Sequence, residues 1–158
     1  MWTVTVFTQR TAAMCWEACG RMMWHWRNGS RPQAERESSS RTAAGTWPAQ
    51  DRGLQEPDMD RFYRQLGMTS SSRATAALLR QKLATSPVIL ILGRRETRHA
   101  CLCLGYTAGA RPTYRIVNPC SALTIDFETD SEVCTASGTT DISAATIQAG
   151  LGRWIWFW

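Results

Sequence analysis

Residues 9–26 read QRTAAMCWEACGRMMWHW, and this stretch decides the fold. From Met14 onward the pattern is that of a helix, because one stripe of a 3.6-residue period collects the apolar side chains Cys15, Cys19, Met22, Met23 and Trp26. Asn28-Gly29 predicts the end of this helix. Cys15 therefore lies in the first turn, where exposed backbone N–H groups and the helix dipole lower the pKa of a thiol from about 8.5 toward the thiolate form.

Composition limits the kinds of protein to consider. A chain of 158 residues with 44% hydrophobic residues can bury a core, and we expect residues 1–158 to form a single domain. The net charge of +5 comes from arginines that are spread along the chain, which argues against a nucleic-acid partner. No apolar run approaches the roughly 18 residues of a membrane span, and no signal-peptide pattern opens the chain. We therefore expect no membrane association, six reduced cysteines and a cytoplasmic location in the producing cell, with signal-independent secretion into a target cell as an open route.

The pattern of apolar residues changes along the chain. Helices are predicted first, and antiparallel strands with a weak helix follow, which indicates the α+β class with the Cys15 helix packed on a C-terminal sheet. The expected elements are a strand or extended lead-in at 2–7, helices at 13–27, 57–67 and 77–83 (the last capped by Ser70-Ser71-Ser72), strands at 87–93, 98–106, 113–119, 123–127 and 154–158, and a weak helix at 141–147. Residues 28–54 and 128–140 are expected to form loops.

Only two histidines are available as a base for the Cys15 thiol. His25 lies ten residues further along the same helix, about 15 Å away at 1.5 Å per residue, and so does not reach the thiol. His99 opens a strand in which His99, Cys101 and Cys103 share one face. We expect the Cys15 helix to lie across that face, so that thiol and imidazole meet and form a thiolate–imidazolium pair.

Two amide side chains complete the pattern. Asn118 is near the end of the next strand, where its side-chain oxygen can orient the imidazole of His99. Gln9 is just upstream of the helix, where its amide can join the Cys15 backbone N–H in an oxyanion hole. The four residue types thus occur in the order Gln9, Cys15, His99, Asn118.

This pattern resembles that of papain-fold cysteine peptidases. Three features carry the resemblance: the motif Gln-x5-Cys-x3-Cys-x2-Met with aromatics at Trp24 and Trp26, the His-Ala-x4-Gly strand from His99 to Gly105, and the Asn118-Pro119 end. They are most similar to those of compact bacterial branches, namely double-glycine leader peptidases and plant-pathogen effector peptidases. The resemblance implies that Cys15 is the nucleophile, His99 the general base and acid, Asn118 the orienting residue and Gln9 the oxyanion donor. We expect Trp16 to line the substrate cleft. The leader peptidases usually carry Asp-Cys-Gly and Asp-Pro, where this chain has Met14-Cys15-Trp16 and Asn118-Pro119.

The sequence therefore predicts a cysteine peptidase that acts on a protein or peptide without cofactor or metal. The resemblance suggests cleavage after small residues such as Gly-Gly. A further hypothesis is a bacterial effector or toxin that is restrained by a cognate immunity protein.

Other interpretations of the same residues remain open. One is another acyl transfer by the same residues, namely deamidation, amide hydrolysis or transglutamination. A non-enzymatic one is a zinc-stabilised binding module that uses Cys15, Cys19, Cys101 and Cys103. Glu17 and Arg98 flank the predicted site residues, and the sequence assigns them no role.

Overall fold

The computed structural model describes residues 1–9, 14–29, 54–93, 98–120 and 138–158. Its elements are α1 (Cys15–Arg27), α3 (Glu56–Gln65), β1 (Thr69–Ser71), α4 (Ala76–Leu83), β2 (Val88–Leu92), β3 (His99–Thr107), β4 (Thr113–Asn118), β5 (Gly138–Ser143), α5 (Ala144–Gly150) and β6 (Leu151–Phe157). The strands form one six-stranded sheet in the order β1-β6-β2-β3-β4-β5, in which every pair of neighbours is antiparallel. This is the α+β arrangement that the sequence predicts.

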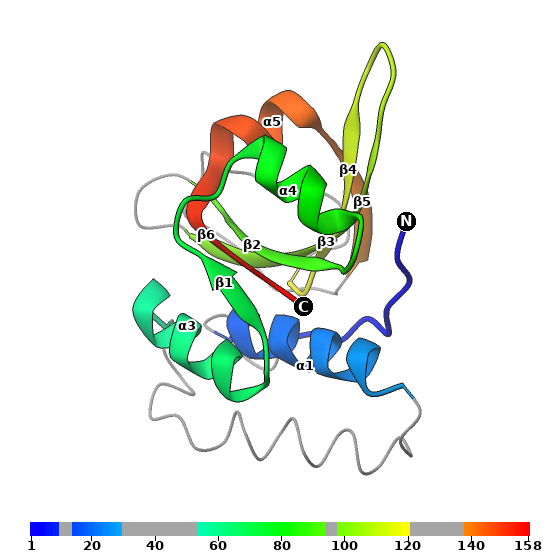
Figure 1. Ribbon diagram of the computed structural model, residues 1–158. Coiled ribbons are helices and arrows are strands. Elements are labelled where there is room, and N and C mark those ends of the chain that lie inside the picture. Colours follow the sequence, from blue (N-terminus) through cyan, green and yellow to red (C-terminus); the bar gives the residue numbers. More distant parts are fainter. Residues whose placement is uncertain (10–13, 30–53, 94–97, 121–137) are drawn as a thin grey trace.

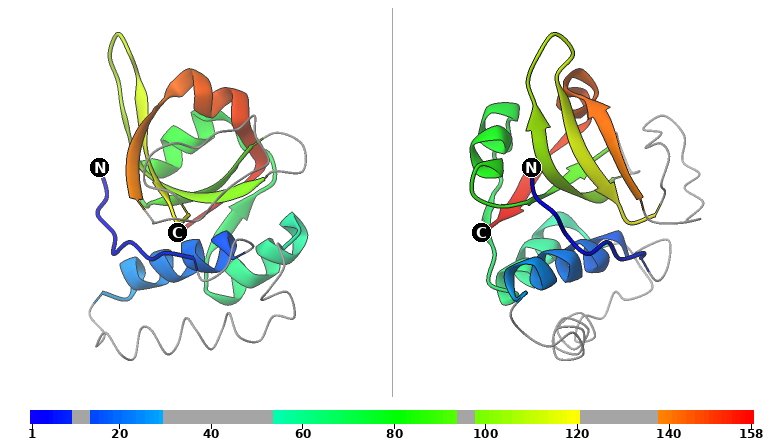
Figure 2. Two further views of the ribbon diagram at one scale, coloured as in Figure 1. Left: turned by 180° about the vertical axis from the view of Figure 1, so that it is seen from behind. Right: turned by 90° about the vertical axis from the view of Figure 1, so that its right-hand side faces the viewer.

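The sheet lies between two helical layers. Helices α1 and α3 cover one face, and α4 and α5 cover the other (Figure 1, Figure 2). All five residues of β2 are buried, because alternate side chains enter the two opposite cores. Within the described part of the chain, every helix is too short or too polar to span a bilayer.

Helix α1 approaches the neighbouring α3 closely because of a glycine. A Cβ atom at Gly20 would lie 2.7 Å from Cε1 of Phe62 and 3.2 Å from Cε1 of Tyr63. The hydroxyl of Tyr63 also donates a hydrogen bond to the carbonyl of Trp16, at 2.8 Å. Helix α3 therefore holds α1 in place through side-chain packing and one hydrogen bond.

The N-terminal residues form an extended segment without regular secondary structure, which is one of the two forms expected for residues 2–7. The segment runs beside the sheet to the start of α1 (Figure 1). The backbone N–H of Trp2 donates to the carbonyl of Leu104 in β3, and the Trp2 indole N–H donates to the carbonyl of Leu83 in α4, each at 2.8 Å. These bonds fix the path by which the chain reaches Gln9.

Several local predictions were wrong. Ser70 and Ser71 belong to strand β1, and the cap of α4 is Thr75, whose hydroxyl accepts a hydrogen bond from the N–H of Leu78 at 3.1 Å. Residues 138–143 form strand β5, where the sequence indicates a loop and the start of a helix. The strand expected at 123–127, and most of the loops expected at 28–54 and 128–140, lie outside the described residues.

The face of β3 that α1 covers was also predicted wrongly. Helix α1 packs on the core that contains Ala100, Leu102 and Leu104, whereas Cys101 and Cys103 lie in the opposite core. Both faces of this strand are apolar, so the alternation of residues does not decide between them. The small side chain of Ala100 allows close approach, and the Cys19 thiol lies 3.4 Å from the Ala100 carbonyl oxygen.

Candidate active site

Cys15 is the first residue of α1 and lies against the start of β3. Its N-cap residue, Met14, makes no side-chain hydrogen bond to the helix, and Cys15 is only 7% exposed. The Cys15 sulfur accepts a hydrogen bond from the backbone N–H of Ala100 at 3.4 Å. The thiol is therefore held between the N-terminus of a helix and the residue that follows His99.

The imidazole of His99 contacts both the thiol and an amide. His99 Nε2 lies 2.7 Å from Oδ1 of Asn118, and the thiols of Cys101 and Cys15 both act on the ring through charge and hydrogen bonding. Because Asn118 occupies Nε2, the other ring nitrogen, Nδ1, is the one left to exchange a proton with the sulfur. His99 is the first residue of β3, and at this end of the strand its ring reaches Cys15 although α1 covers the other face.

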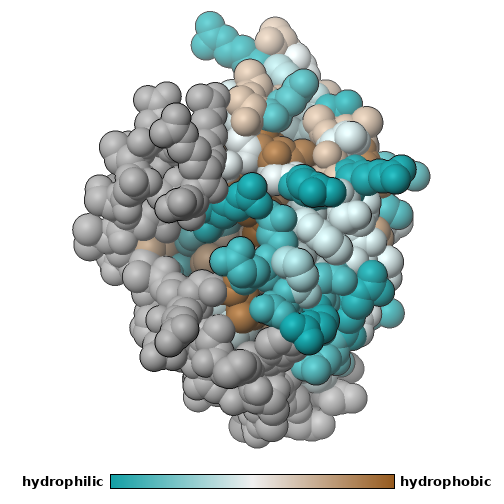
Figure 3. Space-filling model, turned by 90° about the vertical axis from the view of Figure 1, so that its left-hand side faces the viewer, coloured by the Kyte–Doolittle hydropathy of each residue, from teal (hydrophilic) through white to brown (hydrophobic). Residues whose placement is uncertain are grey.

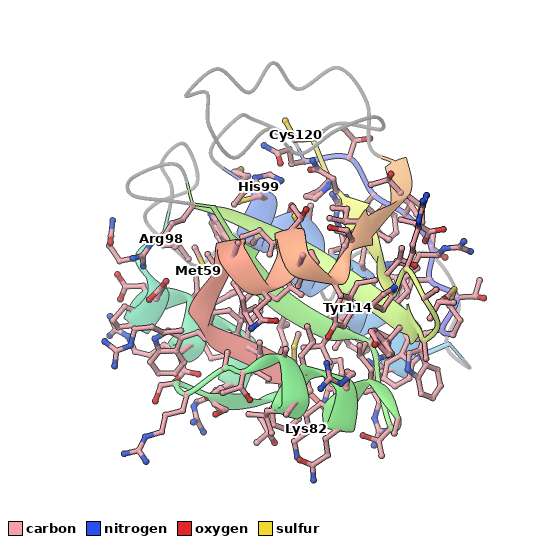
Figure 4. The ribbon with its side chains drawn as sticks, turned by 90° about the horizontal axis from the view of Figure 1, so that it is seen from above. Met59, Lys82, Arg98, His99, Tyr114 and Cys120 are labelled. Carbon is pink, nitrogen blue, oxygen red and sulfur yellow. The ribbon has the colours of Figure 1, made fainter. Side chains whose placement is uncertain are left out.

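Asn118 is itself held by its neighbours. It is 1% exposed, and its Oδ1 also accepts a hydrogen bond from the backbone N–H of Cys120 at 2.9 Å. His99 and Cys120 lie at the same edge of the molecule, away from Lys82 (Figure 4). The amide oxygen thus faces two N–H donors, which fixes the orientation of the side chain and of the imidazole bonded to it.

The surroundings of His99 favour its protonated form. Burial acts to lower its pKa, but the charges of Cys101 and Cys15 and their hydrogen bonds to the ring outweigh burial and raise the pKa well above the ordinary value. A protonated imidazole beside a thiol that can ionise is the arrangement in which cysteine nucleophiles react.

Gln9 lies near the same edge. It is 5% exposed, and its backbone N–H donates to the carbonyl of Pro119 at 3.0 Å, directly after Asn118. The structure therefore brings Cys15, His99 and Asn118 into contact and places Gln9 beside the turn that follows Asn118.

Trp16 lies in the core instead of on an accessible wall. Its side chain has no solvent exposure and packs edge-to-face on Phe62, with ring centroids 4.9 Å apart. This position indicates a role in fixing α1 against α3. Contact between Trp16 and a substrate stays a prediction.

The four thiols of the alternative zinc interpretation are not gathered at one place. Cys15 and Cys19 lie in one core and Cys101 and Cys103 in the opposite one, and among the described residues no group of three potential ligands is placed to hold a metal ion. Burial raises the pKa of Cys19, and the charges of Cys101, Cys15 and Glu17 add to this effect. Burial likewise raises the pKa of Cys103, to about 12.

Cys120 departs from the expectation of reduced cysteines. It is disulfide-bonded, whereas Cys15, Cys19, Cys101 and Cys103 are free thiols. The expectation rested on the pattern of the first residues alone, which gives no information about a particular pair of cysteines.

The sequence does not predict the buried ion pair between Glu17 and Arg21 on α1. Glu17 is fully buried and Arg21 is 6% exposed, with Arg21 Nε 3.4 Å from Glu17 Oε1. Their spacing of four residues on a helix was the available signal, since such pairs meet on one face. His25, one turn further, is buried with its ring 4.6 Å from that of Phe7, in agreement with the prediction that it does not serve Cys15.

Comparison with known proteins identifies the fold and the family of the chain. The fold is similar to that of a solved double glycine motif protease from an AMS/PCAT transporter in complex with the leader peptide, with a TM-score of 0.64 and 15% sequence identity over 98% of this chain and 90% of the other. Fold and sequence together define a papain-like cysteine protease. Residues 2–126 match the model of the family described as papain-like cysteine protease AvrRpt2, and the chain belongs to that family. No match is found among curated proteins.

Proposed function

We propose that this papain-like cysteine protease hydrolyses peptide bonds with Cys15 as nucleophile. The Cys15 sulfur attacks the substrate carbonyl, and the backbone N–H of Cys15 and the Gln9 amide bind the oxyanion. His99 gives its proton to the leaving amine, and the acyl-enzyme forms. His99 then takes a proton from water, which attacks the thioester and releases the acid and the thiol.

One observation carries this assignment of roles. His99 Nε2 lies 2.7 Å from Asn118 Oδ1, and the Cys15 sulfur lies at the start of the same strand, where it accepts a hydrogen bond from the N–H of Ala100 at 3.4 Å. A buried imidazole between a thiol at a helix N-terminus and a fixed amide oxygen has the tautomer and orientation that proton transfer to and from sulfur requires.

The substrate that we propose is a peptide segment with small residues before the cleaved bond, Gly-Gly being the first candidate. The support is the likeness in fold to a double glycine motif protease solved with its leader peptide. Cleavage of a peptide library should therefore follow Gly or Ala in the P1 position. A preference for large P1 residues contradicts this part of the proposal.

The proposed biological setting is a bacterial effector or toxin with a cognate immunity protein. The support is the similarity to effector peptidases, together with the damage that a free peptidase causes in the cell that makes it. Expression of the wild type, but not of Cys15→Ala, should then slow the growth of a host that lacks any partner protein. Equal growth of both strains contradicts the toxin hypothesis.

Comparison of protein termini tests the activity itself. Cells that express the wild type, Cys15→Ala or Cys19→Ala are compared by mass spectrometry of new protein N-termini. Cys19→Ala is the matched control, because it removes a buried thiol one turn further along α1. New termini are expected with the wild type and Cys19→Ala only. A shift of about one dalton on a target, without new termini, would indicate deamidation by the same residues instead.

A further inference from the structure

One peptide group next to the proposed oxyanion donor is held at both ends. The carbonyl of Thr8 accepts a hydrogen bond from Nη2 of Arg21 at 3.2 Å. The N–H of the same peptide group, which belongs to Gln9, donates to the carbonyl of Pro119 at 3.0 Å. The backbone from which the Gln9 side chain projects is therefore fixed both to α1 and to the turn after Asn118.

The Arg21 side chain is in turn fixed by three neighbours. Glu17 lies 3.4 Å from its Nε, the Phe7 ring centroid lies 4.6 Å from its Cζ, and the Thr8 carbonyl accepts from its Nη2. Both members of the ion pair are almost without solvent contact. Burying two charges costs much of what their attraction returns, so a buried pair is weak evidence for a stabilising role. The geometry of the Glu17–Arg21 pair is better explained by the hydrogen bond that Arg21 donates to the Thr8 carbonyl.

Arg21 and Cys15 belong to the same rigid helix. They are separated by about 9 Å along its axis at 1.5 Å per residue. The bond from the Arg21 guanidinium to the Thr8 carbonyl therefore fixes the Gln9 backbone relative to Cys15. The bond to the Pro119 carbonyl fixes it relative to Asn118. Catalysis by an oxyanion hole depends on such fixed placement of the donor.

We infer that Arg21, supported by Glu17, is a positioning residue that sets the Gln9 amide in the oxyanion hole. The inference deepens the proposed function and rests on it. Arg21 touches no reacting atom, and its effect passes through the Thr8–Gln9 peptide group. Loss of Arg21 should lower kcat and leave the Cys15–His99 pair intact, because Arg21 lies about 9 Å further along the axis of α1 than Cys15.

The first test replaces Arg21 by Met, which keeps much of the side-chain volume but has no donor. Hydrolysis of an internally quenched peptide with a central Gly-Gly should show a kcat about 10- to 100-fold lower, with KM little changed. The rate at which iodoacetamide alkylates Cys15 should stay at the wild-type value. Arg27→Met, at an exposed position in the last turn of α1, is the matched control and should behave as the wild type.

A double-mutant cycle separates positioning from a general structural effect. If Arg21 acts through Gln9, the double variant Gln9→Ala/Arg21→Met should be no slower than Gln9→Ala alone. Additive losses, or an Arg21→Met kcat equal to that of Arg27→Met, would overturn the inference. Should Arg21→Met fail to fold, the same cycle is run with Arg21→Lys, which keeps the charge but has a single donor nitrogen in place of the guanidinium. Arg21→Lys should then lower kcat in part when Gln9 is present and should have no effect in the Gln9→Ala background.

The same assay distinguishes the two levels of the proposal. Peptide hydrolysis that is equal in the wild type and in Cys15→Ala refutes the proposed function and the inference with it. Hydrolysis that depends on Cys15 but is unaffected by Arg21→Met leaves the proposed function standing and refutes the inference alone.

Discussion

His99 is the residue that should control the pH dependence of this protease. Burial opposes its ionisation, but Cys101 and Cys15 raise its pKa well above the usual value near 6.5. The protonated form is therefore favoured in the folded protein, an effect present in full below about pH 6.5 and lost as the pH rises through the raised pKa. In the mechanism that we propose His99 donates a proton to the leaving amine, so the alkaline limb of kcat/KM should lie well above pH 6.5.

A pH–rate profile with the quenched Gly-Gly peptide measures this limb, and an NMR titration of the His99 ring measures the pKa directly. In Cys15→Ala the titration should move to lower pH, because one of the two thiols that raise the pKa is gone. A His99 pKa that is the same in both proteins contradicts the proposed pairing of thiol and imidazole.

The thiols should differ strongly in reactivity. Burial raises the pKa of Cys103 to about 12, so on the order of 10⁻⁵ of these thiols are ionised at pH 7. The pKa of Cys19 is also raised by burial and by neighbouring negative charge. Limiting iodoacetamide at pH 7, followed by peptide mapping, should therefore modify Cys15 first. Comparable labelling of Cys19 or Cys103 in the native protein would show that Cys15 is not specially activated.

At the scale of helices and strands, the sequence is most informative where a boundary has a local cause. Pro57 and Gly67 bound the region of α3, and Gly67 adopts a φ of 93°, in the left-handed region that glycine tolerates best. Pro87 and Gly93 likewise enclose β2. The errors occur where distant partners decide: Ser70 and Ser71 pair with Trp156 and Ile155 of β6, so they form a strand instead of a helix cap.

The close contact between α1 and α3 leads to a prediction at Gly20. Alanine favours a helix over glycine by about 1 kcal/mol, but its Cβ would lie 2.7 Å from the Phe62 ring. Overpacking costs about 1–3 kcal/mol, so we expect Gly20→Ala to lower the free energy of unfolding by about 1 kcal/mol on balance. Urea unfolding measures the change, and Gly29→Ala, which meets no atom closer than 3.8 Å, is the control. An increase in stability would mean that α1 and α3 are not packed this closely.

At the scale of the whole molecule, the site gathers residues from four separate parts of the chain. Short motifs indicate Cys15, His99 and Asn118, because a helix start and two adjacent strand ends are local features. The spacing of Glu17 and Arg21 indicates an ion pair only, and the role that we propose for Arg21 depends on the path of residues 1–9 beside the helix. Hydrophilic side chains cover much of the face in Figure 3, with apolar areas visible between them. Surface character therefore gives less information about function than the buried contacts do.

The N-terminal segment joins both helical layers, and Trp2 is its main anchor. Its indole N–H donates to Leu83 of α4, and its ring packs edge-on against Trp26 of α1 with centroids 5.4 Å apart. Trp2→Ala should lower the free energy of unfolding by about 1–3 kcal/mol, because it removes one hydrogen bond and a partly buried aromatic surface. Trp2→Phe keeps most of that surface and should cost only about 1 kcal/mol.

The same anchor should affect catalysis. A segment released at Trp2 still has the bonds to Arg21 and Pro119 close to Gln9, so kcat should fall in Trp2→Ala by less than in Arg21→Met. Urea unfolding and peptide hydrolysis, measured on Trp2→Ala beside the exposed control Thr3→Ala, check both expectations. If Trp2→Ala unfolds and hydrolyses like Thr3→Ala, the segment is not fastened at Trp2, and this prediction is wrong.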